Sequence, residues 1–325
     1  MTETLWFNAI LLLVSFGLLI KGGDWFVDGA VGVAHRFKLP ELLIGATVVS
    51  IGTTLPEVMV SAGAAIESNS GISYGNAIGS IICNTSLISA ITIAFAPNFV
   101  DKRQLRTPVI FFFASSALYC ICAIVFGRFY RWVGILLVLI FLVYMFITVR
   151  QAMRNPEIGE QEVQPQQTAS AGKDILLLVV GAAVIAVGAK FLINSATYIA
   201  QYFKVPDSVI GLTIVALGTS LPEFITAIIS LIKKHANLSL GNIIGANLFN
   251  IILVSGVAIT INPFELPAEK QIFNINASYL IDIPVFLIVM LLLVLPPLIK
   301  GKTYRFQGII LLMIYAAYTI FQFAF

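Results

Sequence analysis

The sequence predicts an all-α membrane protein of ten transmembrane helices, built as two inverted five-helix repeats with broken second and seventh helices at the midplane. Three observations lead to this fold class. Hydrophobic residues make up 59% of the 325 positions and charged residues 11%, against about 25% charged residues in soluble domains. The mean hydropathy is +0.97, and the chain contains ten apolar runs long enough to span a bilayer. Its two halves also share repeated motifs, which indicates an internal duplication.

The apolar runs and one polar stretch define the expected domains. The runs cover residues 5–30, 42–66, 73–96, 107–127, 132–153, 174–201, 208–232, 239–261, 278–299 and 304–324. Residues 154–173 are rich in Gln, Pro and Glu and lack an apolar period, which favours a flexible cytoplasmic linker. We therefore expect a first five-helix repeat over residues 1–153 and a second, inverted one over residues 174–325. Glu3 precedes the first run without a basic segment, so this run should be a retained helix.

The second run contains residues that an ordinary spanning helix avoids. Its segment 52–57 reads Gly-Thr-Thr-Leu-Pro-Glu. Pro56 lacks an N–H, and its ring clashes with the carbonyl four residues earlier, at Gly52. We expect this to break the helix and free carbonyl oxygens at mid-membrane depth. A carboxylate such as Glu57 persists there only if it is buried in protein or lines a wet cavity.

The same motif returns 166 positions later as residues 218–223, Gly-Thr-Ser-Leu-Pro-Glu. Between residues 45–57 and their counterparts, eight of thirteen positions are identical. Residues 75–84 match residues 241–250 at the same displacement, so the duplication extends over neighbouring helices. Because each repeat has five helices, the two copies enter the membrane in opposite directions, an arrangement typical of secondary transporters. Glu57 and Glu223 should then face each other.

Basic residues predict the orientation. Thirteen Lys and Arg residues lie in the loops on one side, against four on the other. The thirteen are Arg36, Lys38, Lys102, Arg103, Arg106, Arg150, Arg154, Lys173, Lys233, Lys234, Lys300, Lys302 and Arg305. This side should be cytoplasmic, which places both termini outside.

Two facing carboxylates need a shared proton or cation. At about 5 Å and an effective dielectric of about 20 they repel by about 3 kcal/mol. Hydroxyls, amides and freed carbonyls surround them in the sequence, and neither Pro-Glu segment contains His or Cys. Hard oxygens with two negative charges suit calcium, and the same oxygens spread over smaller sites suit sodium. Transition metals prefer nitrogen or sulfur, and magnesium sheds its waters reluctantly.

Two further patterns have a structural reading beside the functional one. The Gly-x-x-x-Gly motifs at residues 75–79 and 241–245 favour close helix packing. Asn84 and Asn250 follow them, where each could reach an ion or form an interhelical hydrogen bond. Lys21, Asp24 and Asp28 lie near one helix end, where snorkelling or a local ion pair is expected.

The paired motifs G-T-[ST]-L-P-E and G-N-x-x-G-[SA]-x-x-x-N resemble the α-repeats of the cation/calcium exchanger superfamily. They are most similar to its prokaryotic sodium/calcium exchanger (calcium/sodium antiporter) branch, over essentially the whole chain. The resemblance implies a secondary active antiporter that exchanges sodium for calcium by alternating access. In such a protein, helices 1 and 6 slide past a core of helices 2–5 and 7–10.

The resemblance also implies the ion ligands. Calcium would be held by the side chains of Glu57 and Glu223 and by the backbone carbonyls of Thr53 and Thr219. Sodium would use both glutamates and further groups from the two repeats, namely Ser50, Thr54, Ser80, Ala216 through its carbonyl, Thr219 and Ser220. Asn84, Asn250 and Ala246 would line the middle of the site.

Departures from the family pattern leave alternatives open. Some relatives, including the potassium-dependent branch, carry Asp at the position of Asn250, so its absence argues against potassium co-transport. Ala246 stands where the family often has Ser, which removes one hydroxyl from a sodium site. The Gly-Asn-x-x-Glu pattern of the proton/calcium branch is missing. Potassium-dependent or proton-coupled antiport remains the alternative, and a passive cation channel is a third reading.

Other classes find no support. The sequence has no Gly-x-x-x-x-Gly-Lys-[Ser/Thr] loop, so it does not support an ATP-driven pump. As the exchanger that the resemblance implies, the protein is expected to be no enzyme and to have no catalytic residues. The net charge of +3 gives no indication of nucleic-acid binding. We expect no cofactor beyond the transported calcium and sodium, and no partner beyond membrane lipid. The expected location is the cell inner membrane.

Overall fold

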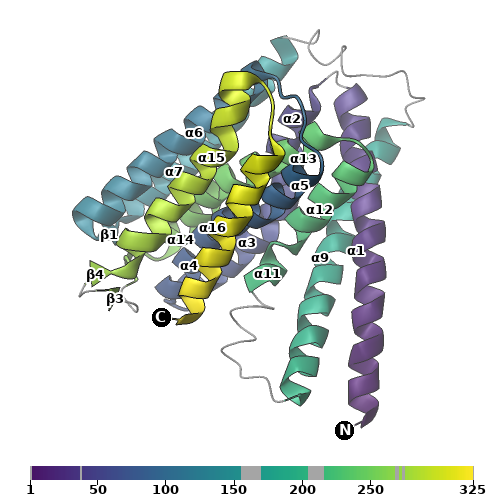
Figure 1. Ribbon diagram of the computed structural model, residues 1–325, viewed down its shortest axis with the longest axis horizontal. Helices are drawn as coiled ribbons and strands as arrows, with labels where there is room; N and C mark the ends of the chain where they lie inside the picture. The colour runs from purple at the N-terminus through teal and green to yellow at the C-terminus, as the bar shows by residue number, and fades with distance from the viewer. Residues whose placement is uncertain are drawn as a thin grey trace.

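The computed structural model describes residues 2–36, 39–154, 170–203, 216–267, 271–272 and 275–324, which are almost entirely helical (Figure 1). Within these ranges, eight helices are long and apolar enough to cross a membrane. They cover Leu5–Arg36, Glu41–Ile66, Ser70–Phe95, Lys102–Phe126, Arg131–Gln151, Ala171–Ala196, Ala236–Ile261 and Ser278–Lys300. The seventh expected run is described only from residue 216 onward, as short helices, and the tenth forms a 20-residue helix. The count of ten spans therefore stays a prediction.

The elements of the first half follow the expected runs. They are α1 (Thr2–Arg36), α2 (Glu41–Ile44), the π-helix η1 (Gly45–Val49), α3 (Ser50–Ile66), α4 (Ser70–Cys83), η2 (Asn84–Ile88), α5 (Ser89–Phe95), α6 (Lys102–Ile121), η3 (Cys122–Phe126), strand β1 (Arg128–Phe129) and α7 (Arg131–Arg154). The expected linker lies almost wholly outside the described residues.

The second half contains the corresponding helices and three short strands. They are α9 (Ala171–Tyr202), α11 (Ala216–Thr219), α12 (Leu221–Ile232), α13 (Ala236–Phe249), η5 (Asn250–Val254), α14 (Ser255–Ile261), β2 (Phe264–Glu265), β3 (Gln271–Ile272), β4 (Ile275–Asn276), η6 (Ser278–Asp282), α15 (Ile283–Lys300) and α16 (Arg305–Ala324). Strand β1 pairs antiparallel with β2, and β3 with β4.

The duplication is visible in the backbone itself. Helix α4, π-helix η2 and helix α5 begin and end 166 positions before α13, η5 and α14, respectively. Two contacts show that these equivalent segments run in opposite directions. Asn262, just after α14, donates to Ser68, just before α4, while Asn98, just after α5, donates to Asn237 at the start of α13. The segments α4–α5 and α13–α14 therefore run antiparallel, as the expected inversion requires.

The same contacts agree with the expected arrangement of loops. Each joins loops that the count of basic residues places on one side of the membrane. The loop after α5 also pairs with the loop after α15, where the Val100 N–H donates to the Gly301 carbonyl at 2.9 Å. Which of the two sides faces the cytoplasm remains a prediction.

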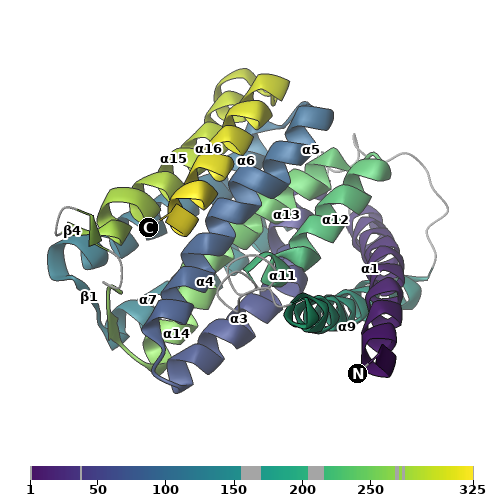
Figure 2. The same cartoon turned by 60° about the horizontal axis from the view of Figure 1, so that its bottom comes forward.

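Helices α1 and α9 form a pair at one edge of the molecule, beside the bundle of shorter helices (Figures 1 and 2). Glycines bring the two backbones together. A Cβ added at Gly29 would collide with the backbone of Leu178, and one added at Gly181 with the backbone of Phe26. Small residues at a helix interface permit such close contact between the backbones of α1 and α9.

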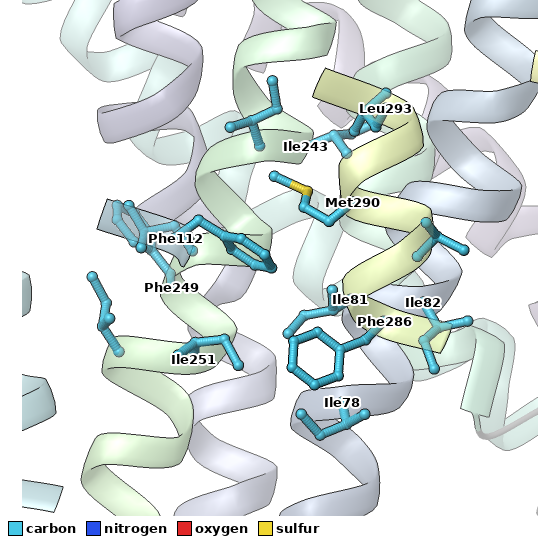
Figure 3. Close-up of a cluster of buried hydrophobic side chains, with 14 of the residues drawn as sticks. Ile78, Ile81, Ile82, Phe112, Ile243, Phe249, Ile251, Phe286, Met290 and Leu293 are labelled. Carbon is cyan, nitrogen blue, oxygen red and sulfur yellow. The ribbon is translucent and has the colours of Figure 1, made fainter. Parts of the chain in front are cut away.

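The bundle is held by apolar side chains from both repeats. Figure 3 shows Phe286 of α15 beside Ile78 and Ile81 of α4. The ring of Phe286 also meets that of Phe112 of α6 edge to face, with centroids 6.5 Å apart. These contacts fix α4 and α13, which carry polar side chains toward the centre.

The expected break in the second helix is wrong for the first repeat. Residues 41–66 form one continuous helical segment, with Pro56 inside α3. A proline within a helix removes one hydrogen bond and presses on the carbonyl four residues earlier, and packing on both sides can hold the chain in a bent helix. The preceding π-helix η1 introduces the local irregularity here, at a wide turn five residues long.

The second repeat does contain a break. Helix α11 ends at Thr219, Ser220 adopts φ −88° and ψ 7°, and α12 begins at Leu221. Pro222 then lies in the first turn of α12, where its missing N–H has no intrahelical partner to lose. The two motifs share their sequence but differ in backbone.

Candidate cation-binding site

Glu57 of α3 and Glu223 of α12 meet in the interior. Both side chains have 0% exposure. The hydroxyl of Thr54 donates to Oε1 of Glu223 at 3.4 Å, which joins the two motifs directly, and the charge of Glu223 acts on Glu57. Two carboxylates in one buried place repel each other and require a counter-charge.

Both carboxylates keep oxygen atoms without a partner. Oε1 and Oε2 of Glu57 and Oε2 of Glu223 have no hydrogen bond to the described residues. Buried polar atoms in proteins are almost always paired, so such atoms indicate a missing ligand or water. No Lys, Arg or His forms a salt bridge with either glutamate in the described chain.

Asn84 and Asn250 occupy equivalent places in the sequence and in the backbone of the two repeats. Each is the first residue of a π-helix, η2 or η5, and each is fully buried. Neither the amide nitrogen nor the amide oxygen of either side chain has a partner among the described residues. Single π-helical turns are frequent at functional sites because they redirect side chains and carbonyls. Among the described residues, neither side chain forms the interhelical hydrogen bond that was the structural alternative.

The hydroxyls of the first repeat are buried, and two of them contact α13. Ser50 Oγ lies 2.7 Å from the carbonyl oxygen of Gly45 and 2.9 Å from that of Asn242. Thr53 donates to Oδ1 of Asn242 at 3.2 Å. Ser80 is buried in α4. In this arrangement Ser50 and Thr53 connect the first repeat to α13 of the second, and the hydroxyl of Thr54 bonds Glu223.

The corresponding residues of the second repeat lie around the break. Ala216 opens α11 and Thr219 ends it. Ser220 is buried, and its hydroxyl has no partner among the residues described. Ala246 is fully buried in α13 and offers no hydroxyl. The second half therefore supplies fewer side-chain oxygens than the first.

The glycine motifs differ between the repeats. A Cβ at Gly241 would collide with the carbonyl of Leu42, and one at Gly245 with Ser50 and Ala46, so both glycines permit close packing of α13 on the second helix. A Cβ added at Gly75 or at Gly79 would have no neighbour within 4 Å in the part of the chain that is described. The positions equivalent to Leu42 and Ala46, residues 208 and 212, fall outside it.

Three hydroxyl side chains form a row, here called the file of hydroxyls, that begins after Glu223. The sequence motifs did not identify it. Thr226 and Ser230 lie three and seven residues after it on one face of α12, and Ser239 lies on the adjoining α13. All three are buried, and none of their hydroxyls has a partner within the described ranges. Ser239 also lines a small cavity with Asn98, at the end of the bundle. The helical spacing of Thr226 and Ser230 within an apolar stretch is the feature of the sequence that could have revealed this row.

The same face has no such file in the first repeat. The equivalents of Thr226 and Ser230 are Val60 and Ala64, and the hydroxyl of Ser73 donates to the carbonyl of Ser61 at 3.1 Å. The two sides of the site are therefore chemically unequal.

Several other charged side chains form ion pairs away from the two glutamates. Lys233 lies 2.8 Å from Asp24 and 2.6 Å from Asp28, and Lys21 lies 3.2 Å from Asp24. Burial lowers the pKa of Lys233, but the hydrogen bonds to the two aspartates outweigh it, so the net shift is upward. The expectation of a local ion pair is confirmed, and Lys233 additionally links α1 to the end of α12. His235 pairs with Glu41 at 2.6 Å.

The donor set resembles no transition-metal centre. No group of three or more His, Cys, Asp or Glu side chains that could hold a metal occurs in the described residues. The free cysteines are buried or half-buried within helices. Two carboxylates, amides and hydroxyls make a hard, all-oxygen set, which suits calcium or sodium.

Comparison with known proteins gives a consistent result. A family model described as "Sodium/calcium exchanger protein" matches residues 7–150 and 173–324. The chain is 28% identical to the sodium/calcium exchanger MaX1 of Methanosarcina acetivorans, covering 97% of this chain and 98% of that protein. It is 34% identical to the inner membrane protein YrbG of Escherichia coli, covering 79% and 80% of the two chains.

A solved structure has the same fold. The sodium-calcium exchanger NCX_Mj, in crystals soaked with sodium and calcium, superposes with a TM-score of 0.81 at 30% identity, covering 96% of this chain and 97% of that one. The match over nearly the whole length agrees with the paired motifs and the buried carboxylates. The chain is a multi-pass membrane protein that belongs to the sodium/calcium exchanger family.

Proposed function

We propose that this protein is a secondary active antiporter that exchanges sodium for calcium across the cell inner membrane. The observation that carries the proposal is the pair of fully buried glutamates, Glu57 and Glu223, with three carboxylate oxygens lacking a protein partner. Membership of the exchanger family narrows the cargo to cations, and the all-oxygen donor set favours calcium and sodium.

Exclusive occupancy would couple the two ions. Calcium bound between Glu57 and Glu223, with the carbonyls of Thr53 and Thr219, quenches both negative charges. Sodium ions would use the same carboxylates, so a calcium ion and a full set of sodium ions cannot be bound together. An empty site leaves two repelling buried charges, which disfavours the closed, dehydrated arrangement without ions.

The sodium ligands follow the same division between the repeats. We assign Ser50, Thr54 and Ser80 from the first repeat. From the second we assign the Ala216 carbonyl, Thr219 and Ser220, while the unpartnered amides of Asn84 and Asn250 line the centre. If more than two sodium ions enter per calcium, each extra charge gains about 2.3 kcal/mol per 100 mV of membrane potential.

Alternating access would come from a rigid pair of helices. Glycines allow the backbones of α1 and α9 to pack closely on each other. At Gly52 and Gly218 the bundle has no side chain where it contacts this helix pair. A Cβ at Gly52 would meet the ring of Phe26 of α1 at 3.2 Å, and one at Gly218 would press on Ile193 of α9. Sliding of this pair past the bundle would open the site to one side at a time.

The test is calcium uptake into everted membrane vesicles driven by an outward sodium gradient. We expect uptake that needs the sodium gradient and that falls to background in Glu57→Gln and in Glu223→Gln. Glu67→Gln is the matched control, because Glu67 is exposed at the end of α3. Uptake that does not depend on sodium, or full activity in Glu57→Gln, would overturn the proposal.

The same vesicles separate the alternatives. Potassium-dependent antiport predicts that uptake rises with potassium at fixed sodium, and proton coupling predicts uptake driven by a pH step without sodium. A passive channel predicts flux without any counter-ion. Two carboxylates in the site, with Asn250 rather than a third acid, favour the potassium-independent sodium exchange.

A further inference from the structure

A second site lies at the end of the bundle where α15 meets α16, away from the buried glutamates. Pro296 and Pro297 lack N–H groups, so they leave the carbonyls of Leu292 and Leu293 without their helical partners. The side chain of Gln307 donates to both carbonyls, at 2.9 and 2.8 Å. This contact holds the first turn of α16 against the proline-rich part of α15.

Two cavities of similar size adjoin at this junction. One, of about 280 Å³, is almost wholly apolar and is lined by Leu292, Pro296, Tyr304, Phe306, Gln307 and Ile310. The other, of about 290 Å³, is lined by Asn98, Phe99, Lys302, Tyr304 and Arg305, among others. Tyr304 lines both, so the apolar cavity, here called the groove, and the cationic cavity, here called the recess, share one lining side chain.

The cationic recess keeps its charge available. Neither Lys302 nor Arg305 pairs with a carboxylate in the described part of the chain. The ammonium of Lys302 lies 5.1 Å from the centroid of the Tyr304 ring, which holds it at the mouth of the groove. Asn98 is already engaged by Thr303 and Asn237, so the recess offers positive charge more than neutral hydrogen-bonding groups.

The surroundings place this site at the membrane surface. Phe99 and Phe306 are 80% and 70% exposed beside the recess and the groove. Large apolar side chains next to unpaired basic residues fit the boundary between acyl chains and headgroups. The site also lies on the side that carries thirteen of the loop Lys and Arg residues, where a cytoplasmic leaflet presents anionic lipid.

We propose that this junction binds one anionic phospholipid, with the phosphate between Lys302 and Arg305 and an acyl chain in the groove between α15 and α16. A free anion would leave the apolar groove unused, and a neutral lipid would leave both cations without a counter-charge. The complementarity therefore selects an amphiphile with a net negative headgroup. The site shares no residue with the cation site, so the proposal stands apart from the antiport function.

The experiment is native mass spectrometry of the full-length protein in detergent, titrated with phosphatidylglycerol, phosphatidylcholine or inorganic phosphate. We expect one phosphatidylglycerol to bind more tightly than phosphatidylcholine, with no competition from inorganic phosphate. Lys302→Gln combined with Arg305→Gln should weaken phosphatidylglycerol about 30-fold, at about 1 kcal/mol per basic residue. Arg150→Gln, at an exposed residue on the same side, should change it less than 3-fold.

A second variant tests the groove independently of charge. Ile310→Trp fills the apolar cavity and should weaken both lipids at least 5-fold, while thermal unfolding confirms that each variant is folded. Equal affinities for the two lipids, equal losses in Arg150→Gln and the double variant, or full displacement by inorganic phosphate would each overturn the proposal.

Discussion

Replacing Glu57 by Gln should have opposite effects on calcium binding and on the ion-free protein. Gln keeps the shape of the side chain and deletes its charge. Glu57 has 0% exposure and no partner at either carboxylate oxygen among the described residues. Without an ion, the buried negative charge therefore destabilises the fold, whereas with calcium it supplies half of the counter-charge.

The magnitudes follow from burial. Removing one member of a buried, opposite-charge contact costs about 3–5 kcal/mol, which corresponds to roughly 150- to 4000-fold weaker calcium binding. In the ion-free protein, two ionised carboxylates about 5 Å apart repel by about 3 kcal/mol at an effective dielectric of 20. Relief of this repulsion contributes about 3 kcal/mol to the gain in unfolding free energy.

The assay is thermal unfolding of purified protein with and without calcium chloride, together with calorimetric titration of calcium. We expect Glu57→Gln to unfold at a higher temperature than the parent without ions and to lose the stabilisation by calcium. Glu67→Gln should behave as the parent in both respects. If Glu57→Gln had a calcium affinity within 3-fold of that of the parent, or unfolded at a lower temperature than the parent without ions, the proposed role of Glu57 would be refuted.

Three further changes test separate parts of the structure. Ala246→Ser adds the hydroxyl that the first repeat carries at the equivalent place, so the sodium concentration for half-maximal calcium uptake should fall a few-fold; an increase would show that this position does not face sodium. Gly245→Ala forces a Cβ into the packed contact of α13 with α3 and should lower the unfolding free energy by about 1–3 kcal/mol. The control Gly63→Ala adds a Cβ that has no neighbour within 4 Å in the described chain, so it should be neutral or slightly stabilising. Equal effects of the two variants in thermal unfolding would contradict this packing. In a cysteine-free background, Ser230→Cys should react with a membrane-impermeant thiol reagent at least 10-fold faster than Ala64→Cys, its counterpart in the first repeat. The reason is that buried hydroxyls without a protein partner require water beside them. Equal reaction rates would mean that no water reaches the file of hydroxyls.

Much of the fold was predictable because the membrane restricts what an apolar run can contain. Glu57 and Pro56 are costly in such a run, so the presence of this pair in two copies predicts a duplicated functional segment. The five helices expected in each repeat predicted antiparallel copies, and α4 and α13 do run in opposite directions. The duplication of the motif and the opposite directions of its two copies together predicted that Glu57 and Glu223 lie close to each other.

The path of the backbone through each motif was less predictable. The same Pro-Glu sequence lies inside a continuous helix at Pro56 and in the first turn of a new helix at Pro222. A local pattern reports that a proline strains a helix, but whether the helix bends or ends depends on the packing of the segments around it.

The order of residues by itself shows the duplication, the acids placed within apolar runs and the oxygen-bearing residues near them, because each recurs at a fixed spacing along the chain. Only the tertiary structure decided which atoms remain unpaired: Ser50 and Thr53 bond Asn242, about 190 positions away, whereas Asn84 and Asn250 find no partner among the described residues. It also decided that Lys233 closes onto α1 and that two prolines and a glutamine shape a groove beside Lys302. Hydrogen bonding and cavities depend on distances between segments far apart in the chain, and no periodicity within one segment encodes those distances.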